Sequence, residues 1–190
     1  MALTAASAKD AVKLRLDIPT SDNTWDALID AVVLTAVARL FPICQQEIAP
    51  VTAAIIVDDY GEAIVPLDAG VSGARRVEVS SGYGWSPADS TFHQDTSIYI
   101  RDLDSTVTQA RIFGLKPYVI TTIPDYLQLA VFWYAMSEFY DYLAGNKRKY
   151  SLYTAGGSRQ VDNMRDESDF YEQKANAYVN DRATLYGSSN

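Results

Sequence analysis

The sequence predicts an α+β fold, in which a helical bundle carries an inserted small antiparallel β-sheet. Apolar residues recur at spacings of three and four near both ends of the chain, which indicates amphipathic helices. The middle third instead contains short runs rich in Val, Ile, Thr and Tyr between turn residues, which indicates antiparallel strands. We expect helices at about 7–16, 22–47, 124–144 and 161–185, and the sheet at about 54–121.

The first two expected helices begin at residues that can cap a helix N-terminus. Ser7 can cap the first helix, which ends before Pro19 because the residue preceding a proline disfavours helical geometry. A polar cluster at 21–24 can cap the second helix, whose apolar stripe runs over 25–40. Pro42 is expected to kink or end this helix, since proline lacks a backbone N–H.

Six short runs form the expected sheet. They are rich in β-branched and aromatic residues, and Asp, Gly and Pro turns separate them. The alternation over 76–80 indicates a strand with one solvent-facing side. The six runs are 54–57, 62–67, 75–80, 97–101, 107–113 and 118–121.

The third helix should be the most buried one. Pro124 and Asp125 are typical of a helix start, and the following residues are apolar around most of the helix circumference. Gly145 and Asn146 can end it. A loop at 150–160, most flexible at its two adjacent glycines, should then lead into the last helix.

The last helix carries a narrow apolar stripe on an otherwise charged surface. Such a stripe suits docking against a neighbouring protein, but a terminal helix that packs back on its own domain has the same pattern. We therefore expect residues 1–149 to form one domain, with its β-rich insertion at about 51–121, and 150–190 to form an extended loop plus a docking helix. The candidate residues for docking to a neighbour are Lys147, Arg148, Tyr150, Tyr153, Arg159, Met164, Tyr171, Tyr178, Arg182 and Leu185.

Composition limits the possible functions. A chain of 190 residues that is 48% hydrophobic can bury a core, and a net charge of −8 disfavours specific binding to nucleic acid or anionic membranes. A pore through which DNA slides stays compatible with that charge. The 13 tyrosines suit a protein interface or the margin of a core, and the basic cluster 147–149 suits a solvated helix C-terminus or an acidic partner. The N-terminus lacks the features of a signal peptide, and no segment is long enough to span a membrane.

Residue types that carry chemistry are sparse. His93 is the one histidine, and no nucleophile-elbow pattern accompanies it; Cys44 is the one cysteine. The acidic pairs Asp58-Asp59 and Asp102/Asp104 lack the spacing of a calcium loop. No glycine pattern of a phosphate-binding loop is present. We therefore expect no catalytic site, no metal and no cofactor.

Three segments in a fixed order resemble the head–tail connector (adaptor) proteins of tailed bacteriophages. They are Ala11–Asp17, Asp26–Val32 and, after the β-rich part, Ile123–Ala130 leading into an aromatic helix. The sequence departs from that pattern at 41–44, where an aromatic-and-glycine helix ending is expected, and in its longer part from Tyr150 onward.

The resemblance implies a structural virion protein. Such adaptors form a homo-oligomeric ring, often a dodecamer, between the portal protein and the stopper or tail proteins. DNA passes through the ring without specific binding. The resemblance places the chain in the virion neck, after synthesis in the host cytoplasm, with 150–190 reaching the portal and the β-rich part forming an outer or tail-facing wall. Alternatives are a tail-completion or neck subunit that contacts the tail, a small hydrolase or nuclease using His93, and an accessory binding module.

Overall fold

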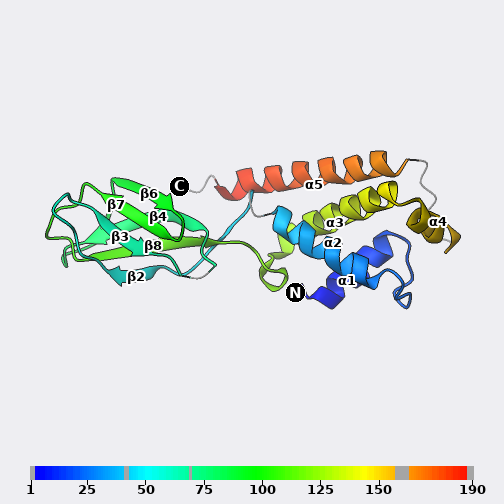
Figure 1. Cartoon of the computed structure of the whole chain (residues 1–190), viewed down its shortest axis with the longest axis horizontal. Coiled ribbons are helices and arrows are strands. Elements are labelled where there is room, and N and C mark those ends of the chain that lie inside the picture. Colours follow the sequence, from blue (N-terminus) through cyan, green and yellow to red (C-terminus); the bar gives the residue numbers. More distant parts are fainter. Residues whose placement is uncertain (1–2, 41–42, 69, 157–162, 188–190) are drawn as a thin grey trace. The chain divides into compact units, whose positions relative to one another are not determined.

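The computed structural model describes the chain except residues 1–2, 41–42, 69, 157–162 and 188–190, and it leaves out the side chains of 182–187. The fold is α+β, with five α-helices and antiparallel sheets (Figure 1). It divides into two compact units: residues 1–44 with 118–190, which we call the helical unit, and residues 45–117, which we call the β unit. Among the described residues, no helix is long and apolar enough to cross a membrane.

The helical unit is built around one long central helix. Its helices are α1 (Ala5–Arg15), α2 (Asp26–Arg39), α3 (Asp125–Gly145), α4 (Lys147–Ala155) and α5 (Met164–Gly187). Helices α1, α2, α4 and α5 all contact α3. Eleven of the 21 residues of α3 are buried, which confirms the prediction that this helix is the most buried.

The start of α1 differs from the prediction. Thr4, rather than Ser7, is the N-cap, and Ser7 completes a capping box. The backbone N–H of Ser7 donates to the Thr4 hydroxyl at 3.1 Å, and that of Thr4 donates to the Ser7 hydroxyl at 2.9 Å. Two backbone donors that helix geometry leaves unpaired are thereby satisfied.

A buried lysine joins α1 to the turn before α2. Lys13 is 1% exposed, and its ammonium group donates to the carbonyls of Thr20 at 3.1 Å and Asp22 at 2.8 Å. It also pairs with the carboxylate of Asp26, which Lys9 contacts at 3.2 Å. A buried ammonium group is tolerated only when it is paired and hydrogen-bonded, so these contacts fix the α1–α2 turn.

Helix α2 is shorter than the predicted 22–47. It begins after Trp25, which is buried, and ends at Arg39 with Leu40 as its C-cap. Cys44 donates its backbone N–H to the carbonyl of Leu40 at 2.7 Å, and Gln46–Glu47 form strand β1. The early end follows from the proline in the sequence at position 42, whose ring and missing N–H oppose a continuing helix.

Helix α4 replaces much of the predicted loop at 150–160. Its N-cap is Asn146, whose side chain accepts a hydrogen bond from the Lys149 backbone at 3.1 Å. Tyr153 is fully buried, and its hydroxyl donates to the Leu16 carbonyl at the end of α1, at 2.8 Å. Its ring meets those of Trp25 and Phe139 edge-on, at 5.9 and 5.5 Å. Burial of this one side chain therefore fastens a polar helix to the core.

The predicted strand at 118–121 is also wrong. Residues Ile120–Thr122 form a 3₁₀ turn, η1, which precedes α3. The Thr122 hydroxyl donates to the Val119 carbonyl and accepts from the Val119 backbone N–H, both at 3.1 Å. This local exchange competes with strand pairing, as threonine hydroxyls commonly do.

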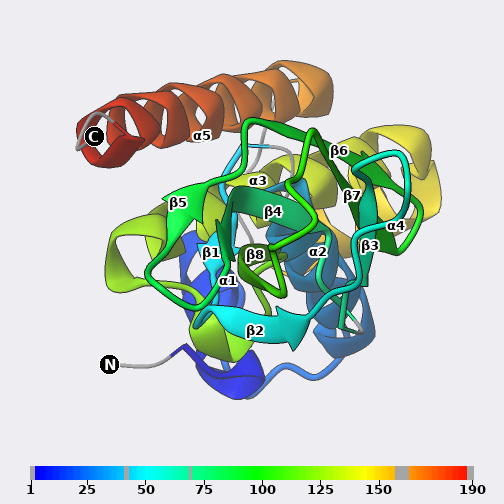
Figure 2. The ribbon, with the colours of Figure 1, turned by 90° about the vertical axis from the view of Figure 1, so that its left-hand side faces the viewer.

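The β unit contains two sheets rather than the one predicted. One sheet has the order β1-β8-β4-β5, with β2 also paired to β8; the other has the order β3-β7-β6, and Figure 2 shows these three strands side by side. All pairs are antiparallel. The bounds are β1 (Gln46–Glu47), β2 (Val51–Ala54), β3 (Ala63–Pro66), β4 (Gly73–Ser80), β5 (Ser86–Pro87), β6 (Ser90–Gln94), β7 (Ser97–Arg101) and β8 (Gln109–Lys116).

The two sheets share one apolar core. Val77, Val79 and Ile112 come from the first sheet, and Val65 and Ile100 come from the second. The predicted strands at 62–67, 75–80 and 97–101 are confirmed within one or two residues. The predicted strand at 54–57 is displaced to β2, and that at 107–113 begins and ends later as β8.

We predict that Asp26→Asn changes how stability depends on pH. Pairing with Lys13 holds the pKa of Asp26 below its ordinary value of 3.8. The ionised Asp26 carboxylate therefore contributes its full stabilisation above pH 3.8. This stabilisation is lost as the pH falls through the lower pKa that Asp26 has in the folded state. In urea denaturation at a series of pH values, the gap between wild type and variant should be widest near neutrality and shrink below about pH 4.

Asp30→Asn is the matched control, because Asp30 is exposed and pairs with the Lys9 ammonium at 3.3 Å rather than with buried Lys13. It should stay close to wild type at every pH. Parallel curves for wild type and Asp26→Asn would show that this carboxylate does not stabilise the fold.

We also predict that Tyr153→Phe destabilises the helical unit by about 1–3 kcal/mol, because the Leu16 carbonyl then loses its buried donor. Tyr142→Phe is the control, since Tyr142 is 39% exposed and its hydroxyl has only a 3.5 Å contact with Asn146. Urea denaturation followed by circular dichroism measures both. Equal losses in the two variants would contradict the anchoring role of Tyr153.

Candidate docking surface

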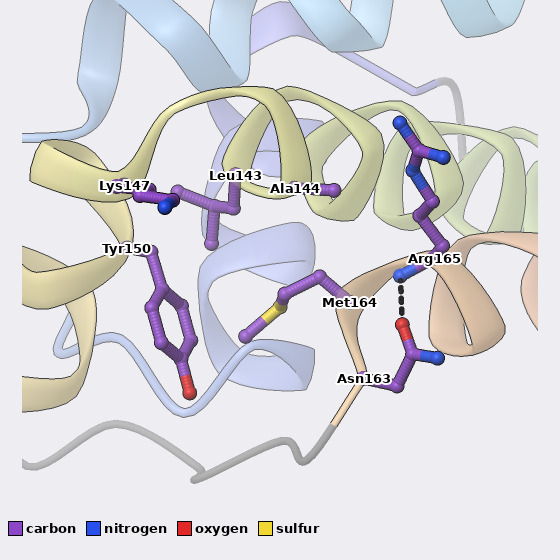
Figure 3. A pocket seen from close by; sticks show the side chains of 7 residues that line it. All are labelled: Leu143, Ala144, Lys147, Tyr150, Asn163, Met164 and Arg165. Atoms are coloured by element: carbon purple, nitrogen blue, oxygen red, sulfur yellow. Dashed lines mark hydrogen bonds between the residues drawn. The ribbon is translucent and has the colours of Figure 1, made fainter.

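An open pocket lies where the end of α3, the start of α4 and the start of α5 meet. Its volume is about 280 Å³, just below the roughly 300–1,000 Å³ usual for ligand pockets. Figure 3 shows Lys147 and Tyr150 on the α4 side, with Met164 facing them from the start of α5. The lining residues are Leu143, Ala144, Lys147, Tyr150, Asn163, Met164 and Arg165. We call this feature the α4–α5 pocket.

The floor of the pocket is apolar and its rim is polar. Leu143 is 1% exposed and Met164 is 7% exposed, so both belong to the core of the helical unit. Tyr150 is half-buried, whereas Lys147 and Arg165 are exposed. This arrangement suits an apolar side chain that enters from solvent and carries negative charge beside it.

Asn163 shapes the α5 side of the pocket. Its side-chain oxygen accepts a hydrogen bond from the Arg165 backbone at 3.1 Å, drawn as a dashed line in Figure 3. Its carbonyl accepts from the Glu167 backbone at 3.2 Å. Asn163 thus caps the first turn of α5, in the way that asparagine commonly caps helices.

The basic cluster 147–149 lies in the first turn of α4. A position at a solvated helix C-terminus does not fully explain this cluster, because cations in the first turn of α4 oppose the dipole of that helix. The other interpretation is contact with an acidic partner. The three side chains differ: Lys149 lies 5.6 Å above the Trp25 ring, Lys147 lines the pocket and Arg148 is exposed. Among the described residues, neither Lys147 nor Arg148 has an ion-pair partner within 4.0 Å.

The pocket gathers three of the predicted docking residues, namely Lys147, Tyr150 and Met164. Tyr153 is different, because it is buried in the core. Arg159 lies outside the described residues, as do the side chains of Arg182 and Leu185.

Tyr171 and Tyr178 use their rings within the helical unit. The Tyr171 ring stacks on that of Tyr140 at 5.8 Å, and the Tyr178 ring meets that of Trp133 edge-on at 5.4 Å. Both contacts join α5 to α3. The apolar stripe of α5 therefore packs against its own unit, which is the second of the two interpretations above.

Polar contacts hold α5 in the same place. The Ser168 hydroxyl donates to the Ser137 carbonyl at 2.9 Å, and the Tyr134 hydroxyl donates to Asn176 at 2.6 Å. Arg39 of α2 bridges Glu138 of α3 at 2.6 Å and Glu172 of α5 at 2.9 Å. Among the described side chains of α5, those of its first turn and its outer face are left for contact with another protein.

Sequence reasoning missed four of the pocket residues, namely Leu143, Ala144, Asn163 and Arg165. Asn163 carried a usable signal, since an asparagine directly before a helical pattern is a candidate N-cap. The other three residues carried no such signal in the sequence, because the pocket exists only where α3, α4 and α5 come together.

The residues considered for chemistry lie apart from the pocket. His93 is exposed on strand β6, which was not among the six predicted strands, and it pairs in register with Ile98 of β7. Cys44 belongs to the helical unit, where burial raises the pKa of its thiol. Within the described part of the chain, no three His, Cys, Asp or Glu residues are grouped so as to hold a metal ion.

Comparison with known proteins gives a distant structural likeness. No family model and no curated protein matches the chain. A solved structure described as "Neck of empty GTA particle computed with C6 symmetry" is similar to it with a TM-score of 0.28 and 15% sequence identity. The similarity covers 71% of this chain and 80% of that chain.

We predict that Met164→Ala enlarges the pocket and destabilises the chain by about 2 kcal/mol, at the low end for a buried methionine because water can enter the open side. Arg165→Ala, on the exposed rim, should stay within about 0.5 kcal/mol of wild type. Urea denaturation compares the two. An unchanged stability of Met164→Ala would show that this side chain is not packed into the floor.

Proposed function

We propose that the chain is a non-catalytic structural subunit of the neck of a phage-like particle, and specifically a head–tail adaptor. The observation that carries the proposal is that the three segments resembling adaptor proteins fold into one helical unit. Leu16 from the first segment, Ile29 from the second and Leu127 from the third belong to the same buried core. The β unit is inserted between the second and third segments.

The ring, its dodecameric stoichiometry and its partners belong to the same proposal. The helical unit forms the ring beneath the portal and contacts the portal or a neighbouring subunit through the α4–α5 region. The β unit forms the outer or tail-facing wall, where stopper or tail proteins dock. The net charge of −8 supports a channel that DNA passes without adhering.

The wall role suits the β unit because it presents apolar side chains outward. Ile64 is 58% exposed on β3, and its register partner Tyr99 stacks on Phe92 at 4.7 Å. Exposed apolar residues grouped on a sheet surface are typical of protein–protein contact. A tail-completion subunit would use the same surface, so the position of the chain in the particle decides between the two roles.

Imaging of reconstituted particles tests the proposal. Purified chain is added to procapsids that bear a portal but lack this protein, and separately to isolated tails, and both samples are imaged by electron microscopy. An adaptor gives ring-shaped density directly beneath the portal. Density at the tail alone supports the tail-completion role, and an absence of density on both structures would refute a place in the neck.

We further predict that His93→Ala attaches as wild type does, since His93 is exposed on β6 and a structural subunit needs no general base. Particle-bound protein is quantified for both chains. A hydrolase or nuclease dependent on His93 would instead lose its activity with the substitution, so hydrolysis that disappears in His93→Ala would overturn the non-catalytic assignment.

A further inference from the structure

A turn of the β unit matches the α4–α5 pocket in both chemistry and charge. The turn joins β2 to β3 and carries two of the most exposed apolar side chains, Ile56 at 91% and Tyr60 at 89%. Asp58 and Asp59 directly precede the tyrosine, and both are exposed. We call these four residues, Ile56, Asp58, Asp59 and Tyr60, the Tyr60 knob.

Hydrogen bonds fix the backbone of the knob. The Asp58 carboxylate accepts from the backbone N–H of Tyr60 at 2.9 Å and of Glu62 at 2.8 Å. Gly61 donates to the Asp58 carbonyl at 3.1 Å, and its own carbonyl accepts from Leu103 at 3.0 Å. Gly61 has a φ of 75°, and an added Cβ would lie 3.1 Å from the Leu103 carbonyl oxygen. A turn fixed in this way loses little entropy when a partner binds it.

The knob also presents uncompensated negative charge. Asp59 has no ion-pair partner within 4.0 Å among the described residues. Arg101 of β7 pairs with Glu62, just after the knob, at 2.7 Å. The other three arginines of the β unit are likewise paired with glutamates, Arg75 with Glu47, and Arg76 and Arg111 with Glu78.

The pocket has the opposite properties. Its floor of Leu143 and Met164 is apolar, and Lys147 and Arg165 at its rim are exposed cations. Exposed Arg148 lies in the same turn as Lys147. A tyrosine ring fits an apolar floor while its hydroxyl stays near solvent, and tyrosine is among the residues that most often anchor interfaces.

We propose that the Tyr60 knob of one copy of the chain occupies the α4–α5 pocket of the next copy. The pocket and the knob are different surfaces, so the contact is head-to-tail, and such contacts close into a ring when their rotation permits. The inference deepens the proposed function and rests on it for the ring, but the contact itself is tested separately. Each subunit would donate one knob and accept one.

Tyr83 provides an internal comparison. It is fully exposed in the β unit, at 101%, but its turn is Ser81-Gly82-Tyr83-Gly84 and holds no charged residue. Tyr83 therefore offers an aromatic ring without the acidic neighbours that would complement Lys147. The acidic residues beside Tyr60 make it, rather than Tyr83, complementary to a pocket with a basic rim.

Sedimentation velocity on three double variants tests the contact. The pocket variant is Lys147→Glu with Arg165→Glu, the knob variant is Asp59→Lys with Tyr60→Ser, and the control is Asp68→Lys with Tyr83→Ser. Wild type and control should self-associate equally. The pocket and knob variants should each associate at least about tenfold more weakly, because the pocket variant reverses the charge of the rim and the knob variant loses both its acidic charge and its anchoring ring.

A mixture of the two defective variants is the decisive sample. The pocket variant keeps its knob and the knob variant keeps its pocket, so an equal mixture should form a heterodimer and nothing larger. Such a heterodimer also shows that both variants are folded. A mixture that stays monomeric, a wild type that does not associate, or a control that weakens as much would each overturn the proposal.

Particle binding separates this contact from the proposed function. Self-association that is unchanged in the pocket variant, together with lost attachment to the portal, would mean that the pocket binds the portal; the contact between copies would then be wrong and the adaptor role would stand. Head-to-tail association as described, without attachment of any chain to the particle, would leave the contact intact and remove the adaptor role.

Discussion

The helical unit depends on one constraint, which is that α3 is apolar around most of its circumference and must be covered on most of its sides. Helices α1 and α2 cover part of it, α5 covers another part, and Tyr153 of α4 closes the region beside Trp25 and Phe139. A single helix that buries eleven residues needs partners from both ends of the chain. The segments before and after the β unit therefore fold together rather than as independent pieces.

That constraint explains how a chain can carry an insertion of this size inside a helical unit. The two ends of the insertion pair with each other, with Gln46 opposite Lys116 and Glu47 opposite Leu115. This short ladder closes the β unit at the point where the chain enters and leaves it. The β unit also has its own core of buried apolar residues, among them Val65, Val77 and Ile112. Changes in the surface turns of the insertion can then leave the packing of α3 unaffected.

Much of the architecture could be predicted from the sequence, because periodic apolar residues and turn residues are local signals. The helix at 124–144 and the strands at 62–67, 75–80 and 97–101 were found in this way. The errors arose where distant contacts decide. Helix α4 exists because Tyr153 reaches the Leu16 carbonyl, and the second sheet exists because β3, β7 and β6 pair apart from β8. Neither contact has a signature in the residues nearby, and the same holds for the pocket, which brings Leu143 beside Met164.

The packing of α5 changes where docking residues should be sought. The narrow apolar stripe of the last helix was a candidate docking surface in the sequence. In the structure, Ser168, Ala175 and Val179 are buried and Tyr171 stacks on α3. Removing this segment would uncover the core, so a truncated chain would lose its fold together with any docking. The exposed positions that combine charge with an apolar contact lie instead at the ends of elements: the first turns of α4 and α5, and the turn before β3. These positions carry cations around an apolar floor in one unit and acids around a tyrosine in the other. Surface charge is free to vary without cost to the core, so its opposite signs at these two places are better explained by contact with a partner than by stability.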